Sequence, residues 1–187
     1  FNIPILVASS FTESPGTIIH GGIAMEVRNK VRGIAHDLDV AKVTILGVPD
    51  RPGIATTIFE ALAKECISVD TIVQNASVER VTDLTFTVAK SDLDKAMRAV
   101  KAVVKSIGAR DSVADAKLGK ISIVGTGMQN TPGYAARMFR ALYEQGINIE
   151  LITTSEIRIT CIIDQSSVKD ALIALHKAFE LEKVGEI

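Results

Sequence analysis

The sequence contains no tryptophan, two tyrosines and two cysteines among its 187 residues, and its aromatic fraction is only 4%. Neither charge is in excess, because 21 lysines and arginines stand against 22 aspartates and glutamates, for a formal net charge of −1. Proteins that bind nucleic acids need a basic surface, and RNA-binding modules also stack bases on aromatic residues. We therefore expect neither a nucleic acid nor an anionic membrane as a partner.

The sequence also has no apolar run near the roughly 20 residues of a membrane span and no secretory leader pattern. Its hydrophobic fraction of 47% and mean hydropathy of +0.27 suit one large or two small compact domains. Cys66 and Cys161 lie in apolar segments without a CxxC pattern, which indicates buried free thiols in a reducing, cytoplasmic compartment. The three histidines are scattered, so no metal site is expected. Because the first residue is Phe1, we expect the chain either to be part of a longer protein or to lack disordered residues that precede Phe1.

An internal repeat is the most informative feature of the sequence. The segment KVTILGV at 42–48 matches KISIVGT at 120–126. The segment GVPDRPGIA at 47–55 is similar to GMQNTPGYA at 127–135, with proline and glycine at corresponding places. The similarity continues through the apolar positions downstream of both segments. The chain therefore contains one module twice.

Each module follows the order strand, helix, strand, strand, helix. Residues 42–48 alternate and are β-branched, as in a strand. Apolar residues then recur at helical spacing, and the buried face is expected to comprise Ile54, Ala55, Ile58, Phe59, Leu62, Ala63 and Cys66. Ser91 is expected to cap the second helix, and Gly108 to end it. This order predicts an α+β fold of two tandem ferredoxin-like βαββαβ modules, with antiparallel sheets and the helices of each module on one face.

The two modules differ in the strand that should complete each sheet. After its second helix the first module still has residues 109–117 available as a fourth strand, whereas the second has only residues 182–187. Residues 31–37, VRGIAHD, precede the first module and belong to neither repeat. We therefore predict that the segment from Val31 to Asp37 is the edge strand of the second module, which would interlock the two.

The loop at 47–55 predicts a ligand site. The first turn of a helix exposes unpaired backbone N–H groups at the positive end of the helix dipole, and these attract a carboxylate or a phosphate. Pro52 favours helix geometry, and Gly53 lets a ligand approach the backbone. Asp50 adds a negative charge, so the loop suits a ligand with both an α-carboxylate and an α-ammonium, such as a free amino acid. The second loop has Asn130 in place of this carboxylate, so we do not expect it to bind the same ligand.

Other interpretations of these residues stay open. The loop at 47–55 also has the composition of a common turn before a helix, and Gln74 or Asn148 taken alone is more typical of a strand end or a turn than of a ligand site. Arg51 is placed like the phosphate-holding arginine of small hydrolases with the same fold order, but no water-positioning residue accompanies it. The glycine pattern of neither a dinucleotide site nor a P-loop is complete. We therefore expect no catalytic residue in this chain.

The tandem repeat with D-x-P-G between strand and helix resembles a pair of ACT domains, the small-molecule sensing modules of amino-acid biosynthesis. VDTIVQN at 69–75, TDLTFTV at 82–88 and especially NIELITTSEIRIT at 148–160 resemble the regulatory region of aspartate kinase, which phosphorylates aspartate. IPILVASSFTESPGTII at 3–19 resembles the end of that enzyme's catalytic domain. Met25 resembles an internal start from which some members make a separate regulatory β subunit. The alternative is an amino-acid-sensing ACT module of another biosynthetic enzyme or a free-standing regulator.

The resemblance implies feedback inhibition by threonine, lysine or both, bound between ACT modules of a homodimer. It implies a catalytic domain or subunit as a further partner, which alone would use ATP and magnesium. The implied effector-binding residues are Asp50, Pro52, Gly53, Ile54, Ala55, Gln74, Asn148 and Ile149. Inhibition is expected to be tuned at Ser77, Thr82, Thr85 and Ser155. The implied domains are a catalytic tail or linker at 1–24, a linker and edge strand at 25–41, and ACT modules at 42–117 and 118–187.

Overall fold

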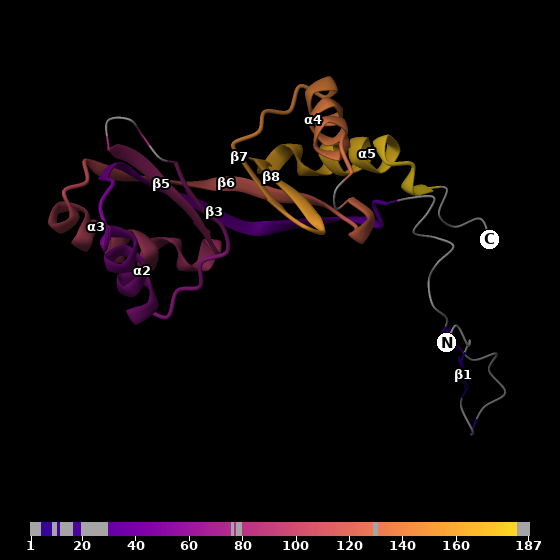
Figure 1. The fold of residues 1–187 in the computed structure, drawn as a ribbon, viewed down its shortest axis with the longest axis horizontal. Coiled ribbons are helices and arrows are strands. Elements are labelled where there is room, and N and C mark those ends of the chain that lie inside the picture. Colours follow the sequence, from indigo (N-terminus) through magenta and orange to yellow (C-terminus); the bar gives the residue numbers. More distant parts are fainter. Residues whose placement is uncertain are drawn as a thin grey trace.

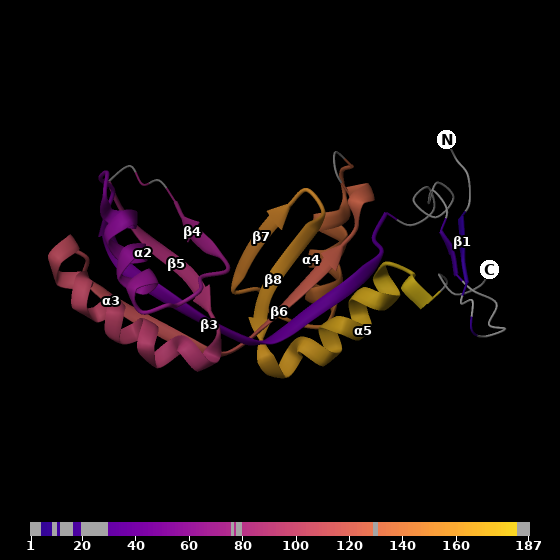
Figure 2. The same ribbon diagram turned by 90° about the horizontal axis from the view of Figure 1, so that it is seen from below.

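The computed structural model describes residues 5–8, 11, 17–19, 30–75, 77, 80–128 and 131–182. Within these residues, four α-helices accompany a six-stranded antiparallel sheet with the strand order β4-β5-β3-β6-β8-β7 (Figures 1 and 2). A separate hairpin pairs β1 (Ile5–Val7) with β2 (Thr17–Ile19). This architecture confirms the predicted α+β class. Met25 and the internal start proposed there lie outside the described residues.

The first module follows the predicted order. Its elements are β3 (Gly33–Pro49), α2 (Ile54–Lys64), β4 (Ile72–Gln74), β5 (Val81–Val88) and α3 (Leu93–Ile107). One apolar core lies between the strands and the two helices, and it includes Ile45, Phe86, Ile58 and Val100. The core therefore uses the faces that the sequence periodicity indicates.

The second module repeats this order after β6 (Asp111–Val124). Its elements are a short 3₁₀ helix (Thr126–Met128), α4 (Tyr134–Glu144), β7 (Leu151–Ser155), β8 (Arg158–Asp164) and α5 (Val168–Ala178). A second apolar core, separate from the first, includes Ile121, Met138, Cys161 and Leu175. The duplication seen in the sequence is therefore a duplication of a folded unit with its own core.

Two long strands run through both modules and join them into one sheet. β3 pairs with β6 from Gly33 opposite Val124 to Leu46 opposite Asp111. The first part of β3 lies beside the second module and its later part lies between β5 and β6 in the first module. The strand predicted over residues 31–37 is thereby confirmed as the edge of the second module, although it begins at Gly33. The predicted domain limits at 41/42 and 117/118 fall inside these continuous strands and stay a prediction.

The helices of the two modules cover opposite sides of the shared sheet. Figure 1 shows α2 and α3 on one side and α4 and α5 on the other. The alternation of side chains along β6 explains this arrangement, because successive residues of a strand point to opposite faces. Ser112 is buried in the first module, whereas Ile121 and Ile123, which have the other parity, are buried in the core of the second. None of the helices in the described part of the chain is long and apolar enough to cross a membrane.

Three local predictions are wrong. Ser91 does not cap α3, because a 3₁₀ turn (Lys90–Asp92) precedes this helix and Asp92 takes the N-cap position without a side-chain cap bond. The buried face of α2 is narrower than expected, since Ala55, Ala63 and Cys66 are exposed. The third concerns the cysteines, which were both predicted to be buried: Cys161 is buried, but Cys66 is exposed. Cys66 follows the end of α2 with a positive φ of 56°, a conformation that turns the chain out of the helix. The predicted end of α3 is confirmed, because Gly108 is its C-cap with φ 77°.

Candidate functional site

The loop between β3 and α2 leaves the start of the helix open. Gly53 occupies the N-cap position with φ 93°, and no side chain caps the helix there. A Cβ atom added to Gly53 would meet no atom of the described residues within 4 Å. Ile54 is buried and anchors the helix in the core, whereas Pro52 and Ala55 are exposed. The backbone at this helix start is therefore accessible to a ligand, and its dipole favours an anion.

Asp50 is held in place through its backbone, which leaves its carboxylate exposed. Its N–H donates to the carbonyl of Arg80 over 2.8 Å, which ties the loop to the start of β5. The neighbouring Arg51 guanidinium donates to the carbonyl of Ile107 at the end of α3 over 3.4 Å. Arg51 thus fastens the loop to a helix end, and this position does not support a phosphate-binding role for it.

The other predicted residues of the first module lie at the same end of the sheet. Gln74 is the last residue of β4 and is exposed. Thr82 pairs with Val48 directly before the loop, and the half-buried Ser77 lies in the connection between β4 and β5. Thr85 lies further along β5, where its hydroxyl is 3.0 Å from that of Thr44. The loop, Gln74 and Thr82 therefore form one candidate site at the end of the first module.

Asn148 and Ile149 lie in the second module, before β7. Asn148 is exposed, and its side-chain amide donates to Glu150 over 3.2 Å. Glu150 also accepts a hydrogen bond from the Lys42 ammonium over 2.8 Å. This hydrogen bond and the charge of Lys42 hold the pKa of Glu150 below its ordinary value, and the Asn148 amide contributes in the same direction. Ile149 is half-buried and packs against the core of the second module.

One chain does not bring the two groups of predicted residues together. The loop at 50–55 opens at the end of the first module, whereas Asn148 precedes β7, and Figure 2 shows α2 and β7 in different halves of the molecule. Ser155, at the far end of β7, pairs with Arg158 and is also remote from α2. A site that contains both groups therefore requires a second copy of the chain.

The second loop has the same helix start but a different surrounding. Gly133 is the N-cap of α4 with φ 103°, again without a side-chain cap. Lys30 lies against this loop, because its ammonium donates to Thr131 over 3.0 Å and its carbonyl oxygen is 2.0 Å from where a Cβ of Gly125 would be. The chain that enters the second module therefore packs on this loop. Asn130 lies outside the described residues.

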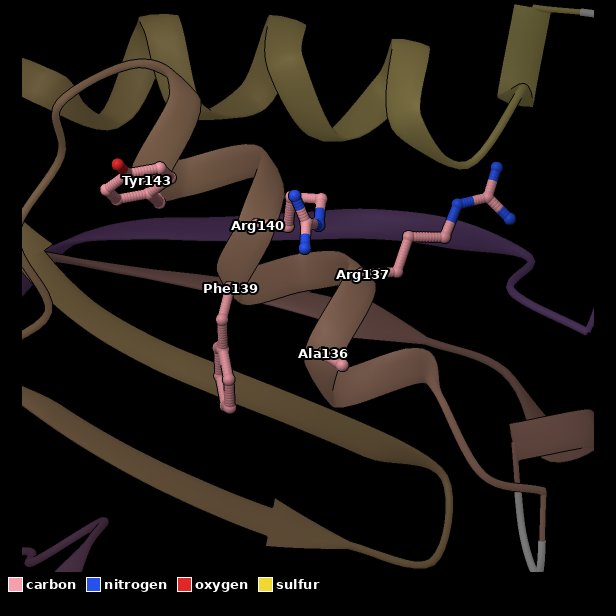
Figure 3. A pocket seen from close by; sticks show the side chains of 5 residues that line it. All are labelled: Ala136, Arg137, Phe139, Arg140 and Tyr143. Carbon is pink, nitrogen blue, oxygen red and sulfur yellow. The ribbon is translucent and has the colours of Figure 1, made fainter.

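A hollow of about 570 Å³ lies on the outer surface of α4 (Figure 3). Its lining residues are Ala136, Arg137, Phe139, Arg140 and Tyr143. Figure 3 shows these side chains spreading away from the helix without converging on one point. Arg137 is also engaged elsewhere, 5.0 Å from the centre of the Phe179 ring and 3.8 Å from Glu180. None of the predicted site residues lines this hollow.

The structure adds residues that the sequence predictions missed. Asp83 accepts a hydrogen bond from the N–H of Gly47 over 2.8 Å, where β3 has a bulge next to the candidate loop. Lys42 and Glu150 connect the modules close to Asn148. A signal for Lys42 was present, since a lysine begins both copies of the repeated strand, KVTILGV and KISIVGT.

The fold and the two glycine loops define a tandem pair of ACT domains. The model of the ACT domain family matches residues 43–103 and 121–179, which are the two modules described above. Similarity to curated relatives extends over nearly the whole chain. An aspartate kinase of Pseudomonas fluorescens is 45% identical over 183 residues, covering 97% of this chain and 44% of the relative. An aspartokinase of Mycolicibacterium smegmatis is 41% identical over 185 residues.

Solved structures give the same result. The regulatory subunit of aspartate kinase from Thermus thermophilus is 41% identical with a TM-score of 0.76, and the match covers 80% of this chain and 99% of that subunit. Aspartate kinase from Synechocystis is 35% identical with a TM-score of 0.80, over 96% of this chain and 33% of that one. The chain belongs to the aspartate kinase family, as its regulatory ACT-domain region. It spans less than half the length of these two curated relatives, 44% in the case of the Pseudomonas fluorescens enzyme.

Proposed function

We propose that this chain binds threonine, lysine or both and thereby mediates feedback inhibition of an aspartate kinase in the aspartate-family pathway. The observation that carries the proposal is the open start of α2, where Gly53 has φ 93° and no atom of the described residues lies within 4 Å of the position of an added Cβ. The exposed carboxylate of Asp50 lies on the same loop. Membership of the regulatory ACT-domain region of aspartate kinases supports this reading of the loop.

The loop suits both ends of a free amino acid. The backbone N–H groups of the first turn of α2 would bind the effector's carboxylate, and Asp50 would bind its ammonium. A hydrogen bond to a charged group contributes about 1.5–3 kcal/mol. Two or three such bonds would give dissociation constants in the micromolar to millimolar range, which suits a sensor of metabolite levels.

Two copies of the chain would complete the site. The edges of the six-stranded sheet are β4 and β7, and each carries an exposed isoleucine, Ile72 at 53% and Ile152 at 45%. An edge-to-edge homodimer would cover these side chains and bring Asn148 and Ile149 of the second copy towards the loop of the first. It would also remove the unpaired strand edges, which otherwise favour aggregation.

A catalytic partner is part of the same proposal. One similar structure is described as aspartokinase alpha and beta subunits, with 42% identity and 99% of that chain covered. We place the phosphorylation of aspartate, and the ATP and magnesium it uses, in a catalytic domain or subunit joined to or bound by this chain in the cytoplasm. Effector binding would change the activity of that partner through a coupling of about 1–3 kcal/mol.

Isothermal titration calorimetry with L-threonine, L-lysine and other amino acids tests the proposed site. Asp50→Asn and Asn148→Ala should each weaken effector binding about tenfold or more, because each loses a hydrogen bond to a charged group. Glu60→Gln, which neutralises an exposed carboxylate further along α2, is the matched control and should bind as the wild type does. Unchanged affinity in both site variants would contradict the site. Sedimentation with and without effector tests the dimer.

A further inference from the structure

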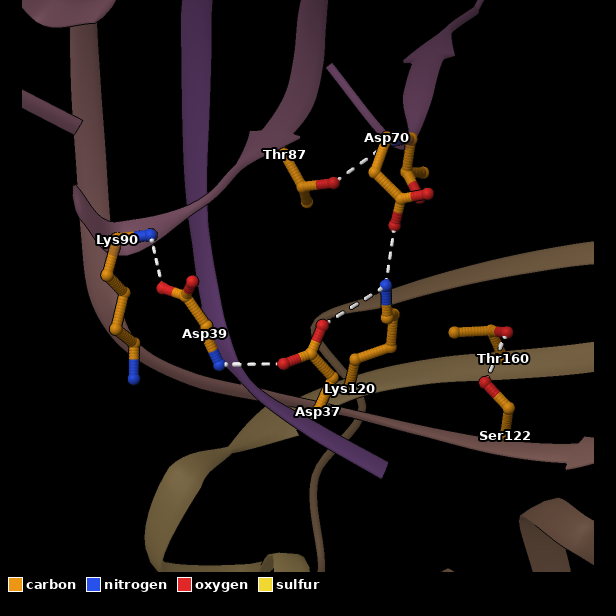
Figure 4. Close-up of polar contacts among 9 residues, drawn as sticks. Asp37, Asp39, Asp70, Thr87, Lys90, Lys120, Ser122 and Thr160 are labelled. Atoms are coloured by element: carbon orange, nitrogen blue, oxygen red, sulfur yellow. Dashed lines mark hydrogen bonds and ion pairs between the residues drawn. The ribbon is translucent and has the colours of Figure 1, made fainter. Parts of the chain in front are cut away.

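Two ion pairs cross between the modules, and each uses a lysine of one module and an acid of the other. Lys42 of β3 binds Glu150, which precedes β7, with an N–O distance of 2.8 Å. Lys120 of β6 binds Asp70, which precedes β4, at 2.7 Å, and Asp37 at 3.6 Å (Figure 4). The internal repeat relates the two pairs, since each lysine begins its copy of the repeated strand and each acid precedes the corresponding edge strand. The pairs are therefore reciprocal contacts of a duplicated unit.

The seam between the modules, which contains the Lys42–Glu150 and Lys120–Asp70 pairs, also contains an apolar contact. Val40, Leu118, Leu151 and Ile162 form a buried cluster, and Val73 of β4 packs against it from the first module. Val40 and Leu118 are paired where β3 and β6 cross from one module to the other, next to shifts in the register of β3. A register shift of this kind bends and twists a strand locally. The seam is thus the part of the chain where a change in the angle between the modules would occur.

The lysines are more buried than their partners. The Lys42 and Lys120 side chains are 19% and 17% exposed, against 37% for Glu150 and 48% for Asp70. A lysine whose side chain is mostly buried depends on its partner more than an exposed lysine does, because the loss of the partner leaves a less well solvated charge uncompensated. A displacement of Glu150 or Asp70 is therefore expected to move its partner lysine, which lies in a strand shared by both modules.

We propose that the Lys42–Glu150 pair transmits effector binding at Asn148 to the angle between the two modules. The proposal rests on the function proposed above and specifies its coupling step. The Asn148 amide donates to one oxygen of Glu150 while Lys42 donates to the other. An effector carboxylate that takes the Asn148 amide removes one of the two bonds that hold Glu150. Lys42 lies on β3, which continues directly to the loop at the start of α2. This strand therefore connects the proposed effector site at Asn148, through Glu150 and Lys42, to the proposed site at that loop.

The test uses the whole protein with its catalytic part and L-threonine and L-lysine as separate probes. Glu150→Gln and Lys42→Met should each leave the half-saturating effector concentration within about threefold of the wild-type value. Each should raise the kinase activity that remains at saturating effector at least about fivefold over that of the wild type, because the coupling of two sites is typically worth that factor or more. The exchange Lys42→Glu with Glu150→Lys should restore inhibition, because it re-forms the ion pair. Because this exchange would also rescue a merely structural defect, the half-saturating effector concentration separates the two roles, since a structural defect that displaces Asn148 would raise it.

Glu65→Gln is the matched control, because it removes an acid that pairs with Lys95 at 3.8 Å within the first module. This variant should be inhibited to the same extent as the wild type. Complete inhibition of Glu150→Gln and Lys42→Met at saturation would overturn the coupling step while leaving the effector site intact. Failure of the wild type to bind either amino acid would overturn the proposed function and this inference together. The two failures are therefore distinguishable in one set of titrations.

Discussion

Gly125→Ala tests whether Lys30 and Val31, which lead into β3, are held by close packing against Gly125, the residue after β6. We call residues 30 and 31 the entering chain. A Cβ at this position would lie 2.0 Å from the carbonyl oxygen of Lys30 and 2.9 Å from Cα of Val31. Both contacts are with backbone atoms, and non-bonded atoms prefer separations of about 3.5–4.0 Å. The entering chain must therefore retreat by more than about 1 Å. Because the Val31 side chain is 0% exposed, this movement would also take it out of the core.

The expected loss of stability follows from these two effects. Forcing an extra methyl group into a packed site costs about 1–3 kcal/mol. Exposing the valine side chain costs about 1.5–3 kcal/mol, and the two costs overlap because one movement relieves the clash by exposing the valine. We expect the free energy of unfolding to fall by about 3 kcal/mol. At a slope of about 2–3 kcal/mol per molar urea, the midpoint of unfolding should fall by about 1 M or more.

Urea denaturation followed by circular dichroism measures this midpoint, since the chain has no tryptophan to report unfolding by fluorescence. Gly33→Ala is the control, because an added Cβ there would meet no atom of the described part of the chain within 4 Å and the backbone φ does not require glycine. It should change the stability by less than about 0.5 kcal/mol. Equal midpoints for Gly125→Ala and Gly33→Ala would refute the view that close packing of Lys30 and Val31 on the second loop stabilises the module.

Two further predictions concern titratable groups. Burial raises the pKa of the Cys161 thiol to about 12, whereas Cys66 is exposed, so iodoacetamide should label only Cys66 in the native protein and both thiols in denaturant. Peptide mass spectrometry checks this, and labelling of native Cys161 would contradict it. Because the pKa of Glu150 is lowered in the folded state, its pair with Lys42 stabilises the fold above about pH 4.5, and this stability is lost as the pH falls through the lowered pKa. The side chain of Glu150 is 37% exposed, so the difference in unfolding free energy between wild type and Glu150→Gln should be about 0.2–1 kcal/mol near pH 7. It should shrink in acid, and a difference independent of pH would argue against the ion pair.

The shared strands explain how a duplicated domain becomes a single mechanical unit. Both β3 and β6 continue without interruption from one module into the other, and the two strands are paired on both sides of the junction. A displacement at the loop after Pro49 therefore acts on a strand that also forms the edge of the second module. Coupling between sites needs an element that both sites bias, and in the proposed mechanism β3 and β6 would be this element.

Much of the fold was predictable because its signals are local. The order of strands and helices follows from hydrophobic periodicity, and the end of α3 at Gly108 follows from the need for a left-handed residue there. The edge strand at 31–37 was predictable because counting strands left the second module one short. The failure at Ser91 has a local reason too, since a 3₁₀ turn and a helix share the same capping residues and the sequence does not distinguish them.

The sequence by itself determined that one module occurs twice, that glycine stands at both helix starts, and which faces are apolar, because these depend on residues close together in the chain. Only the tertiary structure decided that Lys42 meets Glu150, that Lys30 packs on Gly125, and that α2 and β7 lie in different halves of the molecule. Those contacts arise from the pairing of strands far apart in sequence, and local spacing carries no record of which distant segment a side chain will face.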